Sequence, residues 1–339
     1  PFFFYVSATT VIYTLSLHDA LPISRVTKRD VLIADDFKKF IADTNPDLTE
    51  DEVTKIYDNV RLVGAESDFA TLHKVYGWMV NGVQFTPQDE LPRMIPLIDF
   101  DNWNKNIFRV VNQFTVEYTN NGQKENRRPD VLLFVNGIPL CVIELKNPTD
   151  ANATIYDAWE QINIRYWRDI PHLLHYCPLA CISDGVKTRL GTVRTPYEHF
   201  YAWRRVNEGD AVSTLPFAET ETMIKGVYSP ERFLEIFRDY IYFQDSIYDS
   251  DEQEIVCRYP QFFATRLLKQ SIIKSVVEKS GKGGTYFGAT GCGKTYTMAF
   301  LARQLALRCT DIPEDRKSTR LHSSHPSSSS AVFCLKKKG

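Results

Sequence analysis

The sequence has almost no net charge and no long hydrophobic run. Its 40 Lys and Arg residues are balanced by 42 Asp and Glu residues, which gives a formal net charge of −2. The globally basic composition that by itself indicates a nucleic-acid-binding protein is therefore absent, and any such surface must be local. No stretch reaches the roughly 18 uninterrupted apolar residues that a membrane-spanning helix needs. We expect a soluble protein without a membrane partner.

Cysteine is also sparse. Seven cysteines are scattered over 339 residues, an odd number without the regular spacing of a disulfide framework. This usage favours a reducing compartment, so the expected location is cytoplasmic. A hydrophobic fraction of 43% with 24% charged residues is typical of a folded chain. The length fits one large or two modest domains at roughly 100–200 residues per domain.

The two ends of the chain differ from the rest. Residues 1–24 start without Met and contain no Lys or Arg before Arg25, whereas a signal peptide carries its positive charge in front of its apolar part. Residues 316–339 are rich in Ser and end in a basic run. Both segments resemble translated sequencing-adapter sequence, and we predict that both are non-native. The alternative for residues 316–339 is a Ser-rich linker.

The hydrophobic pattern predicts a mixture of helices and strands. Thr49 precedes apolar side chains at helical spacing and has Glu52 three residues later, which predicts an N-terminal capping box. Runs rich in Val, Ile, Phe and Leu at strand length alternate with further helical patterns. The predicted elements are, in chain order, a helix over 49–63, a strand over 108–118, a strand hairpin over 131–146, a helix over 153–170, a strand over 179–185, a helix opened by Pro230 and a helix over 260–280.

A glycine-rich loop follows the last of these helices. Residues 288–295 read Gly-Ala-Thr-Gly-Cys-Gly-Lys-Thr and satisfy the pattern G-x-x-x-x-G-K-[ST] between a short apolar run and a helical pattern. In such a loop backbone N–H groups cradle phosphates, the lysine supplies a positive charge and the hydroxyl binds Mg²⁺. The candidate nucleotide-binding residues are Gly288, Gly291, Gly293, Lys294 and Thr295. A glycine-rich turn with a lysine is the alternative.

The sequence after this loop lacks the second motif of an NTPase. Hydrolysis needs an acidic group that holds the metal and polarises water, and no Asp-Glu pair on an apolar strand follows Thr295. We therefore expect a truncated module that binds phosphate weakly and hydrolyses nothing.

A second constellation combines Asp130 with Glu144 and Lys146. The last two end an apolar run at a spacing that puts both side chains on one face of a strand. Two carboxylates can hold Mg²⁺ against a phosphodiester, and the lysine can position water or stabilise the developing negative charge. This pattern predicts a metal-dependent nuclease, with Asp130 and Glu144 as metal ligands. A structural salt bridge is the alternative.

The nuclease hypothesis makes a demand on strand register. Asn136-Gly137 is a strong hairpin signal, but a two-residue turn there would set Asp130 opposite Ile143 and leave Glu144 on the other face. We therefore expect a three-residue loop or a glycine bulge at Gly137, which would bring Asp130 opposite Glu144.

The chain resembles the R subunit of type I restriction enzymes over roughly residues 30–310. The similarity is carried by RRPDVLLFVNGIPLCVIELKNP (127–148), AWEQINIRYWRDIP (158–171), HYCPLACISDG (175–185) and GATGCGKT (288–295). It implies an α/β fold with a restriction-endonuclease-like PD-(D/E)xK core, a mixed sheet flanked by helices, followed by a truncated P-loop RecA-like helicase segment. The implied limits are 25–225 for the endonuclease domain and 226–315 for the start of the ATP-binding helicase domain.

The resemblance also assigns site residues. It places the nuclease acid, Glu and Lys on Asp130, Glu144 and Lys146, and a supporting catalytic glutamine on Gln161. The family often has a tyrosine four residues after that glutamine, whereas Tyr166 is five residues away here.

The same resemblance extends to ligands and partners. Gln261 resembles the adenine-reading glutamine of superfamily 2 helicases, with a polar residue near a helix start as the alternative. The implied cofactors are Mg²⁺ and ATP. The implied partners are double-stranded DNA and the modification (methyltransferase) and specificity subunits of a restriction complex.

Three functional hypotheses follow. The first is a Mg²⁺-dependent DNA endonuclease of a type I restriction-modification system, fused to the beginning of an ATP-dependent DNA translocase. The second is a P-loop NTP-binding protein whose N-terminal domain is a non-catalytic DNA- or protein-binding module. The third is a structural DNA-binding module with an inactive nuclease fold.

Overall fold

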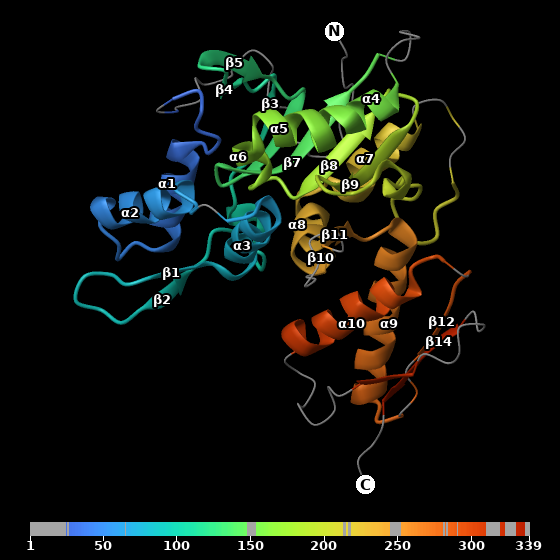
Figure 1. Cartoon of the computed structure of the whole chain (residues 1–339). Helices are drawn as coiled ribbons and strands as arrows, with labels where there is room; N and C mark the ends of the chain where they lie inside the picture. Colours follow the sequence, from blue (N-terminus) through green and yellow to red (C-terminus); the bar gives the residue numbers. More distant parts are fainter. Residues whose placement is uncertain are drawn as a thin grey trace. The chain divides into compact units, whose positions relative to one another are not determined.

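The computed structural model describes most of the chain (Figure 1). The described residues are 25, 27–64, 66–147, 154–212, 215, 218–244, 252–280, 282, 284–289 and 291–309, with the backbone of two strands at 319–322 and 330–335. The predicted non-native segment 1–24 and most of 316–339 lie outside the described residues. No helix in these ranges is both long and apolar enough to cross a lipid bilayer.

The chain divides into two compact units. The first contains the described residues of segments 1–206, 212–234 and 243–255. The second contains those of segments 207–211, 235–242 and 256–339. The first unit thus extends beyond residue 225, where the sequence places the limit of the endonuclease domain.

Three helices and a short hairpin begin the first unit. They are α1 (Ala34–Thr44), α2 (Glu50–Arg61), α3 (Asp68–Asn81), β1 (Val83–Phe85) and β2 (Arg93–Ile95). The predicted capping box of α2 is confirmed: the Thr49 side chain accepts from the backbone N–H of Glu52 over 3.3 Å, and the Glu52 carboxylate accepts from the Thr49 backbone over 2.9 Å. These bonds satisfy N–H groups that the first helical turn leaves without partners.

A five-stranded mixed sheet forms the core of the first unit. Its strands are β3 (Phe108–Asn112), β6 (Val131–Val135), β7 (Ile138–Leu145), β8 (Leu179–Ser183) and β9 (Thr188–Thr192), in the order β3-β6-β7-β8-β9. β7 and β8 are parallel and the other pairs are antiparallel. α4 (Ile155–Glu160) packs on β7 and β8 and continues through a π-helix, η2 (Gln161–Tyr166), into α5 (Trp167–Asp169) (Figure 1). The predicted mixed sheet with flanking helices is confirmed.

The prediction of a single strand over 108–118 is wrong. β3 ends at Asn112, and Gln113 has a φ of 54°, a left-handed conformation that interrupts a strand. The chain then forms a separate hairpin of β4 (Val116–Asn120) and β5 (Gln123–Arg127).

Shorter elements complete the first unit and lead into the second. They are η1 (Trp103–Lys105), α6 (Pro171–Leu174), η3 (Tyr197–His199), α7 (Ala218–Val227), α8 (Pro230–Asp239), β10 (Ile241–Gln244) and β11 (Gln253–Val256). Pro230 is the first residue of α8, as predicted.

The second unit is built around two helices. α9 (Tyr259–Val277) contributes Leu268 and Ile272, and α10 (Lys294–Arg308) contributes Leu301 and Leu305 to one buried cluster. β12 (Gly284–Phe287) pairs antiparallel with β14 (Ser330–Leu335), which pairs with β13 (Thr319–His322). In the described part of the chain β12 has no parallel neighbour, so the sheet of a RecA-like segment is not seen there.

The hairpin of β6 and β7 corrects the expected position of the register shift. Asn136 and Gly137 both have positive φ, 51° and 75°, and form a two-residue turn of the kind that favours Asn-Gly. The expected three-residue loop or bulge at Gly137 is therefore wrong. Instead, Phe134 pairs with Pro139 while Leu133 pairs with Cys141, which leaves Leu140 as an extra residue in β7.

This bulge has a local cause and a consequence for the site. Pro139 lacks the N–H that a regular ladder needs, and proline inside sheets is confined to edges and bulges. Beyond the bulge Val131 pairs with Ile143. The preceding Asp130 is therefore level with Glu144, as the nuclease hypothesis requires.

The turn also anchors α1. The backbone N–H of Ile33, at the start of α1, donates to the carbonyl of Gly137 over 2.8 Å. A Cβ atom at Gly137 would lie 2.2 Å from the Ile33 carbonyl oxygen and 2.9 Å from the Phe37 nitrogen. Only glycine fits this contact.

Gly137→Ala tests the contact against a matched turn. Asn121-Gly122 joins β4 and β5 with a similar φ of 79° at the glycine, but nothing lies within 4 Å of a Cβ there. We expect Gly122→Ala to cost about 1–2 kcal/mol of unfolding free energy for its left-handed backbone alone. Gly137→Ala should cost about 1–3 kcal/mol more through overpacking. Urea unfolding measures both, and equal losses would contradict the contact.

Candidate active site

The buried carboxyl group of Glu144 is the centre of the candidate site. The residue is 0% exposed near the end of β7. The Tyr166 hydroxyl donates to Oε1 over 2.6 Å, and the Gln161 side-chain amide donates to Oε2 over 2.9 Å. The backbone N–H of Asp130 lies 3.3 Å from Oε1. Because a buried carboxyl group needs such partners, these contacts fix its orientation.

Asp130 lies beside Glu144 and is held from two sides. Its Oδ2 atom accepts from the backbone N–H of Leu145 over 2.9 Å, and its Oδ1 atom accepts from the Gln113 side chain over 2.9 Å. The backbone N–H of Gln113 also donates to the Asp130 carbonyl over 2.9 Å. The structure thus brings the two predicted acids together.

Lys146 reaches the same site through Gln161. The backbone N–H of Lys146 donates to the Ser183 carbonyl over 2.8 Å, which continues the pairing of β7 with β8. Its Nζ atom donates to Gln161 Oε1 over 2.7 Å. The Gln161 amide therefore bridges Lys146 and Glu144. Among the described residues, Gln161 Oε1 is the acceptor that the structure shows for Nζ. Since an ammonium group has three donors, Nζ can also donate to a ligand.

The π-helix explains how Tyr166 reaches the site despite its spacing. In a π-helix residues five apart are bonded as i→i+5, and η2 runs from Gln161 to Tyr166. The Gln161 amide donates to the Tyr166 hydroxyl over 2.8 Å. An α-helix would instead bring residues four apart to one face, which is the spacing often found in the family that the sequence resembles. The π-helix therefore accommodates the extra residue between Gln161 and Tyr166 within one turn.

The electrostatics of the site suit a cation. Burial and then the neighbouring Asp130 carboxylate raise the pKa of Glu144 well above its usual range. Burial and the charge of Glu144 likewise raise the pKa of Tyr166, so its hydroxyl stays a donor. Two adjacent carboxyl groups provide the hard oxygen ligands that Mg²⁺ prefers. In the ranges described, no group of three or more His, Cys, Asp or Glu side chains is arranged to hold a metal ion, so the fit rests on these two.

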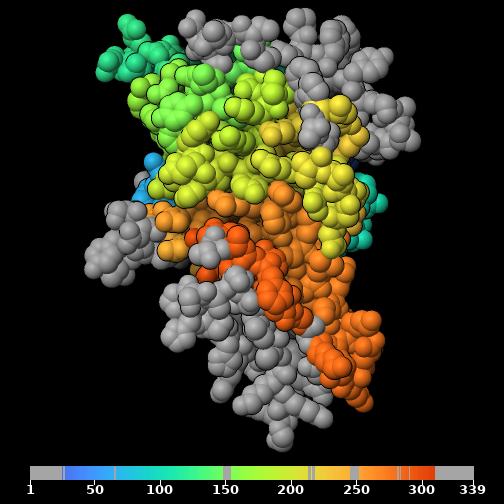
Figure 2. Space-filling view, turned by 90° about the vertical axis from the view of Figure 1, so that its right-hand side faces the viewer, coloured from blue at the N-terminus to red at the C-terminus, as the bar shows by residue number. Residues whose placement is uncertain are grey.

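The glycine-rich loop belongs to the second unit, whose described residues, in orange to red-orange, form part of the surface in Figure 2. Gly291 and Gly293 have φ values of 77° and 81°, which favour glycine. The Lys294 ammonium donates to the carbonyl oxygens of Gly288 and Ala289 over 2.8 and 3.2 Å. The lysine therefore closes over the loop, where phosphate oxygens would compete for it.

The remaining predicted loop residues are Thr295 and Gln261. Thr295 is exposed at the start of α10. Gln261 is buried: its Oε1 atom accepts from the Arg258 backbone over 2.8 Å, and its Nε2 atom donates to the Gly293 carbonyl over 3.1 Å. The amide thus ties α9 to the loop backbone, and a role in reading adenine stays a prediction.

Comparison with known proteins identifies relatives of the chain. Residues 13–199 match the family described as type I restriction enzyme R protein N terminus. The chain is 31% identical over 304 residues to a Methanocaldococcus jannaschii protein named as type I restriction enzyme MjaIXP endonuclease subunit, covering 83% of this chain and 28% of that protein. It is 30% identical over 285 residues to the type I restriction enzyme HindI endonuclease subunit of Haemophilus influenzae, covering 81% and 26%.

The chain therefore belongs to the family of type I restriction enzyme R proteins, to their N-terminal part. It spans 28% and 26% of the length of the two relatives. The family match begins at residue 13, within the segment 1–24 that the sequence analysis sets apart. That segment lies outside the described residues, and its assignment stays a prediction.

Sequence reasoning missed three features that shape the site. Pro139 could have predicted the bulge in β7, because proline cannot donate to a ladder. The five-residue spacing from Gln161 to Tyr166 could have predicted the π-helix. No sequence feature predicts the support that Gln113 gives to Asp130, because that contact depends on a left-handed backbone in a loop.

Tyr166→Phe tests the hydrogen bond to Glu144. We expect the free energy of unfolding to fall by about 1–3 kcal/mol, because a buried acceptor loses its donor. Tyr156→Phe is the control, since Tyr156 on the preceding helix is 46% exposed and should change stability by less than about 0.5 kcal/mol. Urea unfolding measures the stability of both variants. Equal losses of stability would contradict a stabilising hydrogen bond from Tyr166 to Glu144.

Proposed function

We propose that the first unit is a Mg²⁺-dependent DNA endonuclease that hydrolyses phosphodiester bonds within a type I restriction-modification system. The observation that carries the proposal is the convergence of three side chains on one place: Gln161 links Lys146 to Glu144, and the backbone N–H of Asp130 lies 3.3 Å from the Glu144 carboxyl group. Family membership supports it, because the relatives are named endonuclease subunits of type I restriction enzymes.

The role of each side chain follows from its contacts. Asp130 and Glu144 would hold a Mg²⁺ ion, and such an ion would polarise the scissile phosphate and lower the pKa of a water molecule. Gln161 and Tyr166 fix the Glu144 carboxylate. The Lys146 ammonium faces the negative charge that develops on the phosphate.

The hydrogen bonding of Lys146 favours this assignment over a structural salt bridge. In the part of the chain that the structure describes, its ammonium bonds to the neutral Gln161 amide and takes part in no ion pair. A neutral partner leaves the positive charge of Lys146 available to an anionic ligand. A lysine placed only to neutralise a buried carboxylate would contact that carboxylate directly.

The second unit begins an ATP-dependent DNA translocase in this proposal. The loop from Gly288 to Lys294, with its two left-handed glycines, receives the phosphates of ATP. Double-stranded DNA is the substrate, and the modification and specificity subunits of the restriction complex are the protein partners. The names of the relatives support this assembly only at the level of a type I restriction enzyme.

Lys146→Ala tests the nuclease. With supercoiled plasmid and Mg²⁺ or Mn²⁺, we expect the nicking rate to fall by about 10²–10³-fold, the usual cost of losing one donor to a developing anion. The variant should still bind DNA. Lys39→Ala is the control, because Lys39 pairs with the exposed Asp43 on α1, and it should nick at the wild-type rate.

Two results would overturn the proposal. One is undiminished nicking by the Lys146 variant. The other is a wild-type chain that binds DNA and metal without nicking, which would favour a non-catalytic DNA-binding module.

A further inference from the structure

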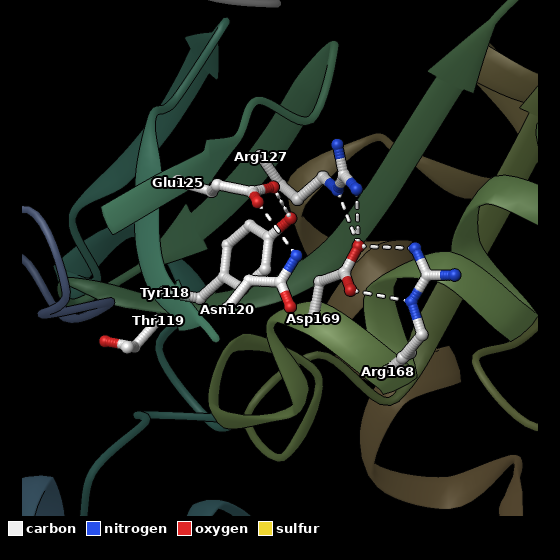
Figure 3. A pocket seen from close by; sticks show the side chains of 7 residues that line it. All are labelled: Tyr118, Thr119, Asn120, Glu125, Arg127, Arg168 and Asp169. Carbon is white, nitrogen blue, oxygen red and sulfur yellow. Dashed lines mark hydrogen bonds and ion pairs between the residues drawn. The ribbon is translucent and has the colours of Figure 1, made fainter. Parts of the chain in front are cut away.

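A second polar site lies in the first unit between the β4–β5 hairpin and the end of α5. An open pocket of about 420 Å³ is lined there by five residues of the hairpin and by Arg168 and Asp169 (Figure 3). The lining is mostly polar and contains two guanidinium groups. Neither the proposed cleavage chemistry nor the glycine-rich loop uses these residues.

Asp169 organises the two guanidinium groups. Its side chain is 7% exposed, and its carboxylate accepts from Arg127 Nε over 2.7 Å and from Arg168 Nε and Nη2 over 2.7 and 3.0 Å. The bonds from Arg168 and Arg127 hold the pKa of Asp169 below its usual range. The carboxylate is therefore charged and fixes the planes of both arginine side chains.

The outer edges of both guanidinium groups remain for a ligand. Arg127 contacts Asp169 through Nε and Nη2, and Arg168 does the same. In Figure 3 the third nitrogen of each group points away from Asp169. Two arginines on one carboxylate leave a local charge of +1 at this end of the pocket, and Glu125 on the opposite wall balances that charge over the whole lining. Oriented guanidinium donors at the positive end are suited to a phosphate group.

The opposite wall restricts where an anion fits. Glu125 accepts from the Tyr118 hydroxyl over 2.5 Å and from the Asn120 amide over 2.8 Å. Hydrogen bonds from Tyr118 and Asn120 lower the pKa of Glu125, so it is charged as well. An anion is repelled from this wall and directed to the guanidinium end.

Two residues of the pocket are close in sequence to residues of the candidate active site. Arg127 is three residues before Asp130, and Asp169 is three residues after Tyr166. Three extended residues span at most about 10 Å. Phosphates of one DNA strand follow each other every 3.4 Å or so along the helix axis, so this reach covers about three nucleotides.

We propose that this pocket binds a backbone phosphodiester of the DNA strand within about three nucleotides of the bond that is cut. The inference rests on the proposed nuclease function and adds a substrate contact to it. The contact is independent of base sequence, because a phosphate group carries no base information.

Arg168→Gln tests the contact without cleavage. Arg168 is 65% exposed, and Arg127 still pairs with Asp169 in the variant, so folding is preserved. Duplex binding by the full chain is measured by fluorescence anisotropy in EDTA at a series of KCl concentrations. The slope of log K against log salt should become shallower by about 0.9, the value for one lost phosphate contact. The loss should be equal on duplexes of unrelated sequence.

Two further variants make the result specific. Arg168→Lys keeps the charge and should restore the slope. Arg93→Gln is the matched control, because Arg93, the first residue of β2 in another hairpin, also pairs with an aspartate, Asp47, and its slope should be that of the wild type.

Three outcomes would overturn the pocket. They are an unchanged slope for Arg168→Gln, a wild-type chain that does not bind duplex, and a loss of slope in Arg168→Gln that Arg168→Lys fails to restore. A changed slope in a chain that fails to nick would instead contradict the nuclease function and leave the phosphate contact standing.

Discussion

Satisfying one buried carboxyl group is the constraint on which the arrangement of the first unit depends. Glu144 is fully enclosed, and an ionised group without partners costs several kcal/mol in such a place. Its three donors come from two separate parts of the chain: the backbone before β6, and the Gln161 amide and Tyr166 hydroxyl of the π-helix η2. The sheet and the helix that covers it must therefore meet in one register.

Two irregularities produce that register. The bulge at Leu140 shifts β7 by one residue against β6, and a shift of one residue moves every side chain to the other face. The π-helix from Gln161 to Tyr166 adds one residue to a turn of the covering helix. Bulges and π-turns are found preferentially at functional sites. Without the bulge, Glu144 would lose its contact with Asp130. Without the π-helix, it would lose the hydrogen bond from Tyr166.

The sequence was sufficient for several local parts of the fold. The Thr49 capping box, the apolar run of β7 and the position of the hairpin at Asn136-Gly137 are local patterns, and local patterns predict local structure. The length of that turn was predicted wrongly. The candidate acids and Lys146 could be selected from residue type and spacing. Their adjacency in space needed a register shift, which the sequence analysis expected at the wrong residue.

Other features depend on tertiary contacts that no local pattern encodes. Gln113 supports Asp130 from a loop with positive φ, and Asp169 bonds to Arg127, which lies 42 residues earlier in the chain. Gln261 bonds to the backbone of the glycine-rich loop rather than facing an open site. Each contact connects segments whose distance is set by the packing of the core.

We propose that Asp130 and Glu144 together bind one divalent cation. Titration of the full chain with Mn²⁺, followed by electron paramagnetic resonance, tests it most directly, with Asp43→Asn as the control for an exposed carboxylate. The account predicts one ion per wild-type chain, and an affinity lower by about tenfold or more in Asp130→Asn, because ligand charge sets the affinity of hard-cation sites. Equal Mn²⁺ binding by wild type and Asp130→Asn would contradict it.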